Sequence, residues 1–132
     1  MPIEPSNFSQ NEAWLLFRLT EAPLRTERDG DFNVFALLDV ATGLILGMEF
    51  VEASASEPSE LQSRRLLSGA EGSAGCRPQL VYYDSERDLE NFAASLSALS
   101  IEACPELEGH LAPLTREARE GFLAHLAGDE SQ

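Results

Sequence analysis

The sequence is poor in basic residues: nine arginines and lysines stand against 23 aspartates and glutamates, so the net charge at pH 7 is -14. A field of that sign repels phosphate groups, and nonspecific affinity for nucleic acids comes mainly from Lys and Arg. Only Arg64 and Arg65 are adjacent, and two arginines do not form a basic patch. We therefore do not expect nucleic acid as a partner.

Cysteine is scarce, and the sequence has neither a long apolar run nor a recognisable secretory signal. The N-terminus has neither the basic nor the apolar region of a signal peptide, so the expected location is the cytoplasm. Cys76 and Cys104 are the two cysteines, and in that compartment both are expected to be reduced. No run of about 18 apolar residues is present, so no membrane span is predicted.

The common cofactor and catalytic motifs are missing too. His110 and His125 have no second nitrogen or thiolate at ligand spacing, which argues against zinc, and neither accompanies a Ser or Cys motif for nucleophilic catalysis. The stretch GAEGSAG at 69–75 lacks the Lys-Ser/Thr pair of a phosphate-binding loop. These absences favour a protein without a cofactor.

The chain does have enough apolar residues for one core. Hydrophobic residues make up 43% of its 132 residues, which is ordinary for a single globular domain. We expect that domain over 13–127. The polar segment 1–12 is expected to be a loose N-terminal arm, and the acidic segment 128–132 a frayed tail.

Three apolar runs in the first half predict three strands. They read AWLLFRL, FNVFALLD and LILGMEFVE, and turn-forming residues bound each of them. Asp29-Gly30 supplies a turn before the second strand, and Gly43 supplies one before the third. Links this short favour an antiparallel meander.

A helix, a strand and a second helix are expected next. The first helix is predicted over 57–68, with Ser56 as its N-cap and Pro58 in its first turn, and the glycine-rich stretch 69–75 as a flexible connection. RPQLVYYD is a fourth strand. Ser85 is expected to cap the second helix, with Glu86 and Asp88 in its first turn. The apolar residues of this helix repeat at helical spacing: Leu89, Phe92, Ala93, Leu96 and Leu99.

A fifth strand and a third helix complete the expected fold. SIEAC reads as a short strand, and LTREAREGFLAHLAG as a helix that ends at Gly128. Its inward face is expected to carry Ala118, Phe122, Leu123 and Leu126. The predicted class is therefore α/β (α+β, mixed sheet), with five strands in the order β-β-β-α-β-α-β-α.

This element order, with two local patterns, resembles the ribonuclease H-like fold of retroviral integrase cores and transposases over 13–127. The first pattern is a Trp-led opening strand, a second strand ending in Asp-x-x-Thr-Gly and a third reading LILGMEFVE. The second is PQLVYYDSERDLENF followed by LSALSIE. The chain is also similar to uncharacterised bacterial domain families that share the Trp opening and the D-x-x-T-G-L-I-L-G hairpin. Membership there implies no known activity.

The ribonuclease H-like resemblance implies a site made of three carboxylates. Active members carry one on the first strand, one at the end of the fourth and one on the last helix, and together these hold two Mg or Mn ions. Asp84 matches the second position. Glu120 matches the third, since 35 residues separate the two, and Glu117 lies one helical turn earlier.

The first-strand position departs from that pattern. It is occupied by Phe17, and the neighbouring Arg18 would repel the metals. Glu21, just past the strand, is the nearest alternative ligand. Asp39 ends the second strand, at the opposite edge of the sheet, and is expected to be a turn residue. Trp14 is expected to be partly buried, with an interface anchor as the alternative.

Two classes of function remain open. The first is a non-catalytic interaction or regulatory domain, a pseudoenzyme that associates with itself or with a protein partner; in it Asp84 is a strand-end or helix-capping residue. The helix carboxylates Glu117 and Glu120 then belong to a solvated face with Arg116 and Arg119. The second is a divalent-metal-dependent nuclease or phosphotransferase that uses Asp84, Glu120 and a third ligand such as Glu21. Fold alone does not decide between them.

Overall fold

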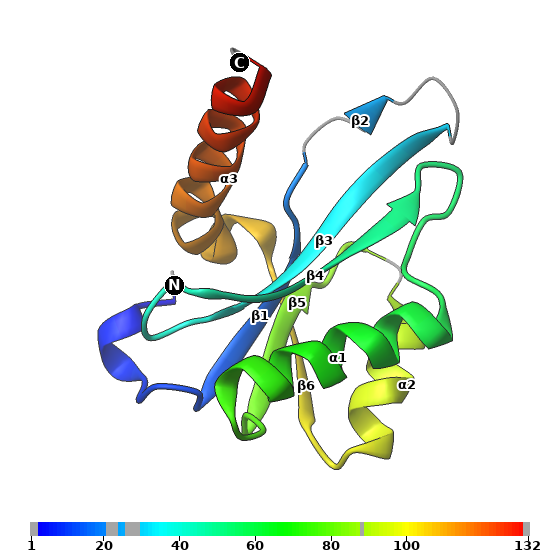
Figure 1. Ribbon diagram of the computed structural model, residues 1–132. Coiled ribbons are helices and arrows are strands. Elements are labelled where there is room, and N and C mark those ends of the chain that lie inside the picture. The colour runs from blue at the N-terminus through cyan, green and yellow to red at the C-terminus, as the bar shows by residue number, and fades with distance from the viewer. Residues whose placement is uncertain (1–2, 21–23, 26–29, 88, 131–132) are drawn as a thin grey trace.

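The computed structural model describes residues 3–20, 24–25, 30–87 and 89–130. One mixed sheet is covered on one face by helices α1 (Glu60–Ala74) and α2 (Glu90–Ala98), and on the other by α3 (Glu108–Glu130) (Figure 1). The predicted order of three antiparallel strands, helix, strand, helix, strand, helix is confirmed. Among the described helices, none combines the length and the apolar character needed to cross a membrane.

The sheet joins an antiparallel half to a parallel half. Strand β1 pairs antiparallel with β3, β3 pairs antiparallel with β4, and β5 lies parallel to both β1 and β6. The order across the sheet is therefore β4-β3-β1-β5-β6, which makes β4 and β6 the two edges. The bounds are Ala13–Arg18 for β1, Asp31–Asp39 for β3, Ile45–Glu52 for β4, Leu80–Asp84 for β5 and Glu102–Glu106 for β6.

One further strand was not predicted. Strand β2 consists of Leu24–Arg25 and pairs with the start of β3, opposite Asp31 and Phe32. It lies in the link that was expected to be only a turn. Of that expected turn, Asp29 falls outside the described residues, and Gly30 has a φ of 84°.

Side chains alternate between the two faces of the sheet and form two core clusters. Trp14, Leu16 and Val81 pack with the apolar residues of α1 and α2. Leu15, Phe17 and the other members of the second cluster face α3. The run Ala13 to Phe17 is buried throughout. A strand covered on both faces carries apolar residues continuously, which explains why this run does not alternate with polar residues.

Helix α1 begins later and runs further than predicted. Its N-cap is Ser59, not Ser56: the Ser59 hydroxyl accepts from the Gln62 N–H at 3.1 Å, and the Gln62 side chain accepts from the Ser59 N–H at 2.9 Å. The stretch expected as a flexible connection is helical as far as Ala74. Packing accounts for this, because Ala70 is fully buried against the sheet and Gly47 of β4 lets the helix come close: a Cβ there would lie 3.3 Å from the Leu66 carbonyl oxygen.

Helix α2 is capped from a distant segment. Ser85 is exposed and does not cap it; the N-cap position is Leu89, which makes no side-chain capping bond. The Glu57 carboxylate instead accepts from the backbone N–H groups of Glu90 at 3.2 Å and Asn91 at 2.8 Å. A carboxylate at a helix N-terminus is favoured by the helix dipole. Asp88, also expected in the first turn, lies outside the described residues.

Helix α3 is longer at both ends than the sequence predicted. It starts at Glu108, before Pro113, and passes through Gly128 to Glu130 instead of stopping there. Pro113 removes one backbone donor without ending the helix, and the nearby Thr115 hydroxyl lies 3.3 Å from the Ala112 carbonyl oxygen. Ala118 and Phe122 pack against the sheet as expected, whereas Leu123 is 60% exposed. The Leu126 side chain lies outside the described part of the chain.

The N-terminal segment is not a loose arm where it is described. Ile3 packs on the core cluster below α3, and its N–H donates to the His110 carbonyl at 3.3 Å. A short 3-10 helix, Pro5–Asn7, follows. The Phe8 ring then meets the Tyr82 ring edge-on, with centroids 6.1 Å apart. The apolar contacts of Ile3 and Phe8 therefore keep this segment packed against the domain, although its polar composition predicted a loose arm.

Asp39 and Trp14 are buried together at the start of β1. Asp39 lies opposite Trp14 in the register, which confirms that it is at the end of the sheet away from Phe17 and Arg18. Its carboxylate accepts from the Asn11 N–H at 3.0 Å and from the Thr42 hydroxyl at 2.8 Å. Trp14 is 1% exposed and donates to Asn11 Oδ1 at 3.2 Å, so it is a core residue and not an interface anchor.

Candidate functional site

A small pocket lies where the carboxyl ends of β1 and β5 adjoin under α3. The parallel register pairs Leu15 with Tyr82, which places Phe17 beside Asp84 two residues further along both strands. The cavity measures about 20 Å³, room for about one water molecule. Its lining comes from four elements and the segment between β5 and α2: Leu16, Phe17, Arg18, Phe35, Asp84, Arg87, Leu89, Glu108, Leu111, Thr115 and Arg119.

Asp84 ends β5 as predicted and has local partners. Its Oδ1 accepts from the Glu86 N–H at 2.9 Å, which closes the turn after the strand. Its Oδ2 lies 3.7 Å from Arg87 Nε, and the Asp84 side chain is 15% exposed. One oxygen thus stabilises a turn and the other faces an arginine.

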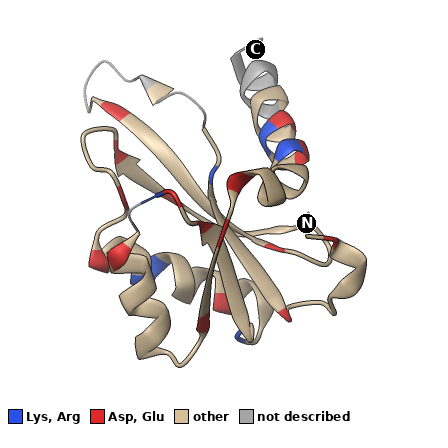
Figure 2. Ribbon diagram, turned by 180° about the vertical axis from the view of Figure 1, so that it is seen from behind, with Lys and Arg blue, Asp and Glu red and all other residues tan. Residues whose placement is uncertain are grey.

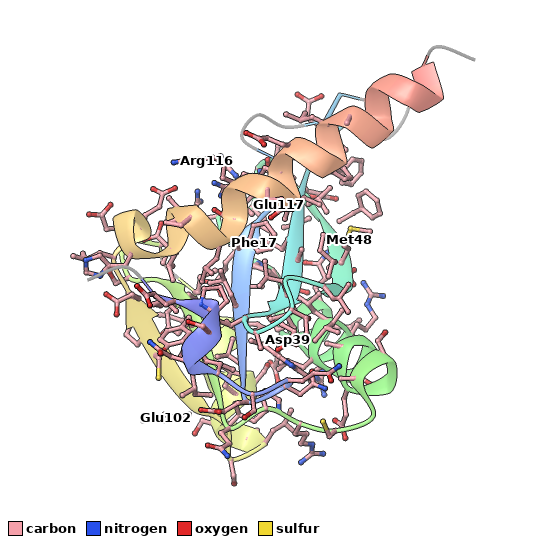
Figure 3. All side chains as sticks on the ribbon, turned by 90° about the vertical axis from the view of Figure 1, so that its left-hand side faces the viewer. Phe17, Asp39, Met48, Glu102, Arg116 and Glu117 are labelled. Carbon is pink, nitrogen blue, oxygen red and sulfur yellow. The ribbon has the colours of Figure 1, made fainter. Side chains whose placement is uncertain are left out.

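Arg119 occupies the place above Phe17. Its guanidinium lies over the Phe17 ring, 5.8 Å from the centroid. Its Nε donates to the Arg18 carbonyl at 3.0 Å, and its Nη1 donates to the Thr115 hydroxyl at 3.3 Å. These three contacts fix a permanent cation at the end of β1, and Figure 3 shows Phe17 directly below α3.

The pocket gathers positive charge in an acidic molecule. Arg18, Arg87 and Arg119 are a third of the nine basic residues in the chain, and the carboxylates among the described lining residues are Asp84 and Glu108. Elsewhere the acidic residues are spread over strands, loops and helices (Figure 2). The sequence drew attention to Phe17 and Arg18, but it gave no sign that Arg119, expected on a solvated face, turns toward them.

The structure does not bring Glu117 or Glu120 to Asp84. Glu120 is exposed and absent from the pocket lining, because it lies about 100° around the helix from Arg119. Glu117 borders a different groove, between α3 and β4. Glu21 lies outside the described residues. Glu108 does line the pocket, but the sequence analysis missed it because the helix was expected to start after Pro113.

The described donors therefore do not fit a pair of divalent metals. Within the described ranges, no group of three or more His, Cys, Asp or Glu side chains is placed to share an ion. Two-metal sites need several carboxylate oxygens converging on one point, whereas here a guanidinium and an aromatic ring occupy that position. The pocket is also too small to admit a nucleotide beside them.

A second group of polar residues lies along β5 and β6. His110 Nδ1 and Glu106 Oε1 are 2.7 Å apart; this hydrogen bond, followed by one from the Leu107 N–H, lowers the pKa of Glu106 below its ordinary value of 4.5. Burial raises the pKa of Cys104, and the Glu102 and Glu106 carboxylates raise it further. Burial likewise raises the pKa of Tyr82. A thiol kept protonated in this way is a poor nucleophile, and both Cys104 and Cys76 are free.

Comparison with solved structures finds a distant structural likeness, whereas the other two comparisons find nothing. No protein-family model and no curated protein matches the chain. Among solved structures, it is similar to a chain in the cryo-EM structure of the simian T-cell lymphotropic virus intasome in complex with the PP2A regulatory subunit B56 gamma. The identity is 12% and the TM-score 0.49, and the match covers 92% of this chain but only 44% of that one. A likeness this distant carries no statement about function.

Proposed function

We propose that this chain is a non-catalytic interaction or regulatory domain of the cytoplasm, built on a ribonuclease H-like scaffold. The strand order β4-β3-β1-β5-β6, antiparallel in its first half and parallel in its second, supports the scaffold. One observation above all supports the loss of catalysis. Where an active member would have its first-strand carboxylate, Phe17 lies under the guanidinium of Arg119.

Electrostatics explains why Phe17 and Arg119, in place of a carboxylate, are incompatible with two-metal chemistry. A guanidinium stays protonated at every relevant pH, so a metal bound at Asp84 would meet fixed positive charge from Arg87 and Arg119. An aromatic ring supplies no oxygen ligand in return. Arg119 instead joins α3 to the end of β1, and Arg87 pairs with Asp84 within the turn after β5, so both arginines stabilise the fold.

Calorimetric titration with MnCl2 and MgCl2 tests the proposal. We expect no saturable heat at millimolar metal that depends on Asp84, so the wild type and Asp84→Ala should give the same curve. Glu117→Gln serves as the matched control, because Glu117 is a carboxylate on the same helix as Glu120 but borders another groove. Saturable binding abolished by both Asp84→Ala and Glu120→Gln, and retained in Glu117→Gln, would establish the metal-dependent nuclease or phosphotransferase instead.

A further inference from the structure

The two edges of the sheet are protected to different degrees. Edge strand β6 carries Pro105, which has no N–H to offer, between Glu102 and Glu106. These are common devices that keep an edge strand from pairing with another chain. Edge strand β4 is longer, contains no proline, and its Glu49 is neutralised by Arg65 at 2.7 Å on the α1 side. The edge formed by β4 is therefore the one left open.

The face of β4 that points toward α3 is apolar and uncovered. Ile45, Met48 and Phe50 lie opposite Leu38, Ala36 and Val34 of the buried β3 face, but α3 does not reach over them. They are 40%, 49% and 57% exposed, and Leu44 just before the strand is 59% exposed. We call these four side chains the β4 patch. Figure 3 shows Met48 at the margin of the sheet, beside α3.

A bulge lets these residues share one face. The register passes from Leu37 opposite Gly47 to Leu38 opposite Ile45, so Leu46 is the extra residue. Leu46 packs on the α1 side, and Ile45 returns to the side of Met48. A groove of about 610 Å³ separates the patch from α3, and Glu117 is the charged residue among its described lining residues. The groove is thus apolar in a chain of net charge -14.

The outer backbone of β4 is available at Met48. Gln62 donates to the Phe50 carbonyl at 3.0 Å, so that carbonyl points away from β3. Because backbone groups point to alternate sides along a strand, those of Met48 also point outward. Among the described residues, none is recorded as bonding to them. The Phe50 carbonyl can accept a second hydrogen bond, so Gln62 does not block pairing there.

We propose that the β4 edge is the self-association surface of this protein, and that β4 pairs antiparallel with β4 of a second copy about a two-fold axis at Met48. This inference rests on the proposed function and names the partner of the interaction domain. An edge strand is self-complementary about such an axis, since each copy offers the same donors and acceptors to the other. The two β4 patches then lie side by side on one face of a continuous sheet.

Charge and area favour a second copy at this surface. Two copies of charge -14 repel each other, so they approach most easily through a face that carries few unpaired carboxylates. Here Glu49 is paired with Arg65, Glu117 lies at the groove wall, and the exposed Glu52 stands at the last residue of β4, away from the axis at Met48. The β4 patch exposes on the order of 400 Å² of apolar surface, as large as the main patch of many monomers. The strand backbone and the flanks of α1 and α3 add toward the roughly 800 Å² that each partner of a stable dimer buries.

Sedimentation over a concentration series tests the proposal. We expect the wild type to pass from monomer to dimer between about 1 µM and 1 mM. Met48→Arg should raise the dissociation constant about 100-fold or more, because it brings two charges together in a desolvated interface. The control is Leu107→Arg, which changes a side chain 52% exposed next to the other edge and should leave dimerisation unchanged. Circular dichroism confirms that both variants are folded.

Cross-linking locates the axis independently of any destabilising charge. In a Cys76→Ser, Cys104→Ser background, Met48→Cys should oxidise to a covalent dimer, since residues paired across an antiparallel ladder have Cα atoms about 5.5 Å apart. Leu107→Cys should not. A wild type that is monomeric throughout the concentration series would overturn this inference, and so would a Met48→Arg variant that dimerises as the wild type does. Neither outcome bears on the metal titration. Metal binding through Asp84 would overturn the proposed function and leave the dimer standing.

Discussion

Asp39 is a buried carboxylate whose role is structural. It is 1% exposed and ties the segment before β1 to the β3–β4 turn through Asn11 and Thr42. Asp39→Ala removes the acceptor for both donors, so we expect a loss of about 2–3 kcal/mol in the free energy of unfolding. Asp39→Asn, which keeps one oxygen acceptor, should lose less. Urea denaturation measures both.

Asp31 provides the comparison for Asp39 on the same strand. It lies at the other end of β3 and is exposed, so Asp31→Ala should change the stability by less than about 0.5 kcal/mol. If Asp39→Ala cost no more than Asp31→Ala, the two hydrogen bonds at Asp39 would not stabilise the fold.

At the candidate site, the sequence revealed the residues that lie on strands but not the one that reaches them from a helix. Phe17 and Asp84 follow from strand spacing, because residues two apart share a face and a strand end is marked by turn formers. Arg119 makes a contact 101 residues away along the chain, with the Arg18 carbonyl. Arg119 is next to Glu120 in the sequence. Helical periodicity alone does not say which of these two side chains faces the sheet.

Among the elements, strands β1, β3, β4, β5 and β6 were predictable, whereas β2 and the helix ends were not. Strands β1, β3 and β4 are apolar runs between turn residues, so local sequence defines them. Helix α1 runs through Gly69 and Gly72 because Ala70 is buried against β4, a tertiary contact that overrides low helix propensity. The start of α2 was missed because its capping carboxylate, Glu57, lies 33 residues before Glu90 in the chain.

That distant cap yields a prediction for α2. Glu57→Ala leaves two N–H groups at the helix start without their acceptor, and we expect it to cost about 1–2 kcal/mol in unfolding free energy. Glu57→Gln keeps one oxygen and loses the charge, so its cost should be intermediate. Glu86→Ala, an exposed glutamate in the turn before α2, is the matched control. Equal stabilities of Glu57→Ala and Glu86→Ala in urea denaturation would show that the cap contributes nothing.

For the whole molecule, charge is the dominant feature outside the core. The 23 acidic residues stand against nine basic ones, so most of the negative charge has no basic side chain with which to pair. Repulsion among like charges destabilises a compact state, and salt screens it over a Debye length of about 10 Å at 0.1 M. The same screening should tighten the β4 dimer, because the repulsion between copies weakens while their apolar contact remains.

Thermal unfolding at neutral pH should therefore shift upward as NaCl is added to about 0.5 M, by a few degrees for a domain of this size. Protein kept well below the dimer dissociation constant separates this effect from self-association. The net charge falls toward zero as the pH approaches the sequence pI of about 4.3, so the increase should be smaller when the series is repeated at about pH 5. The same rise at both pH values would show that salt acts through general apolar burial rather than through the charge of -14.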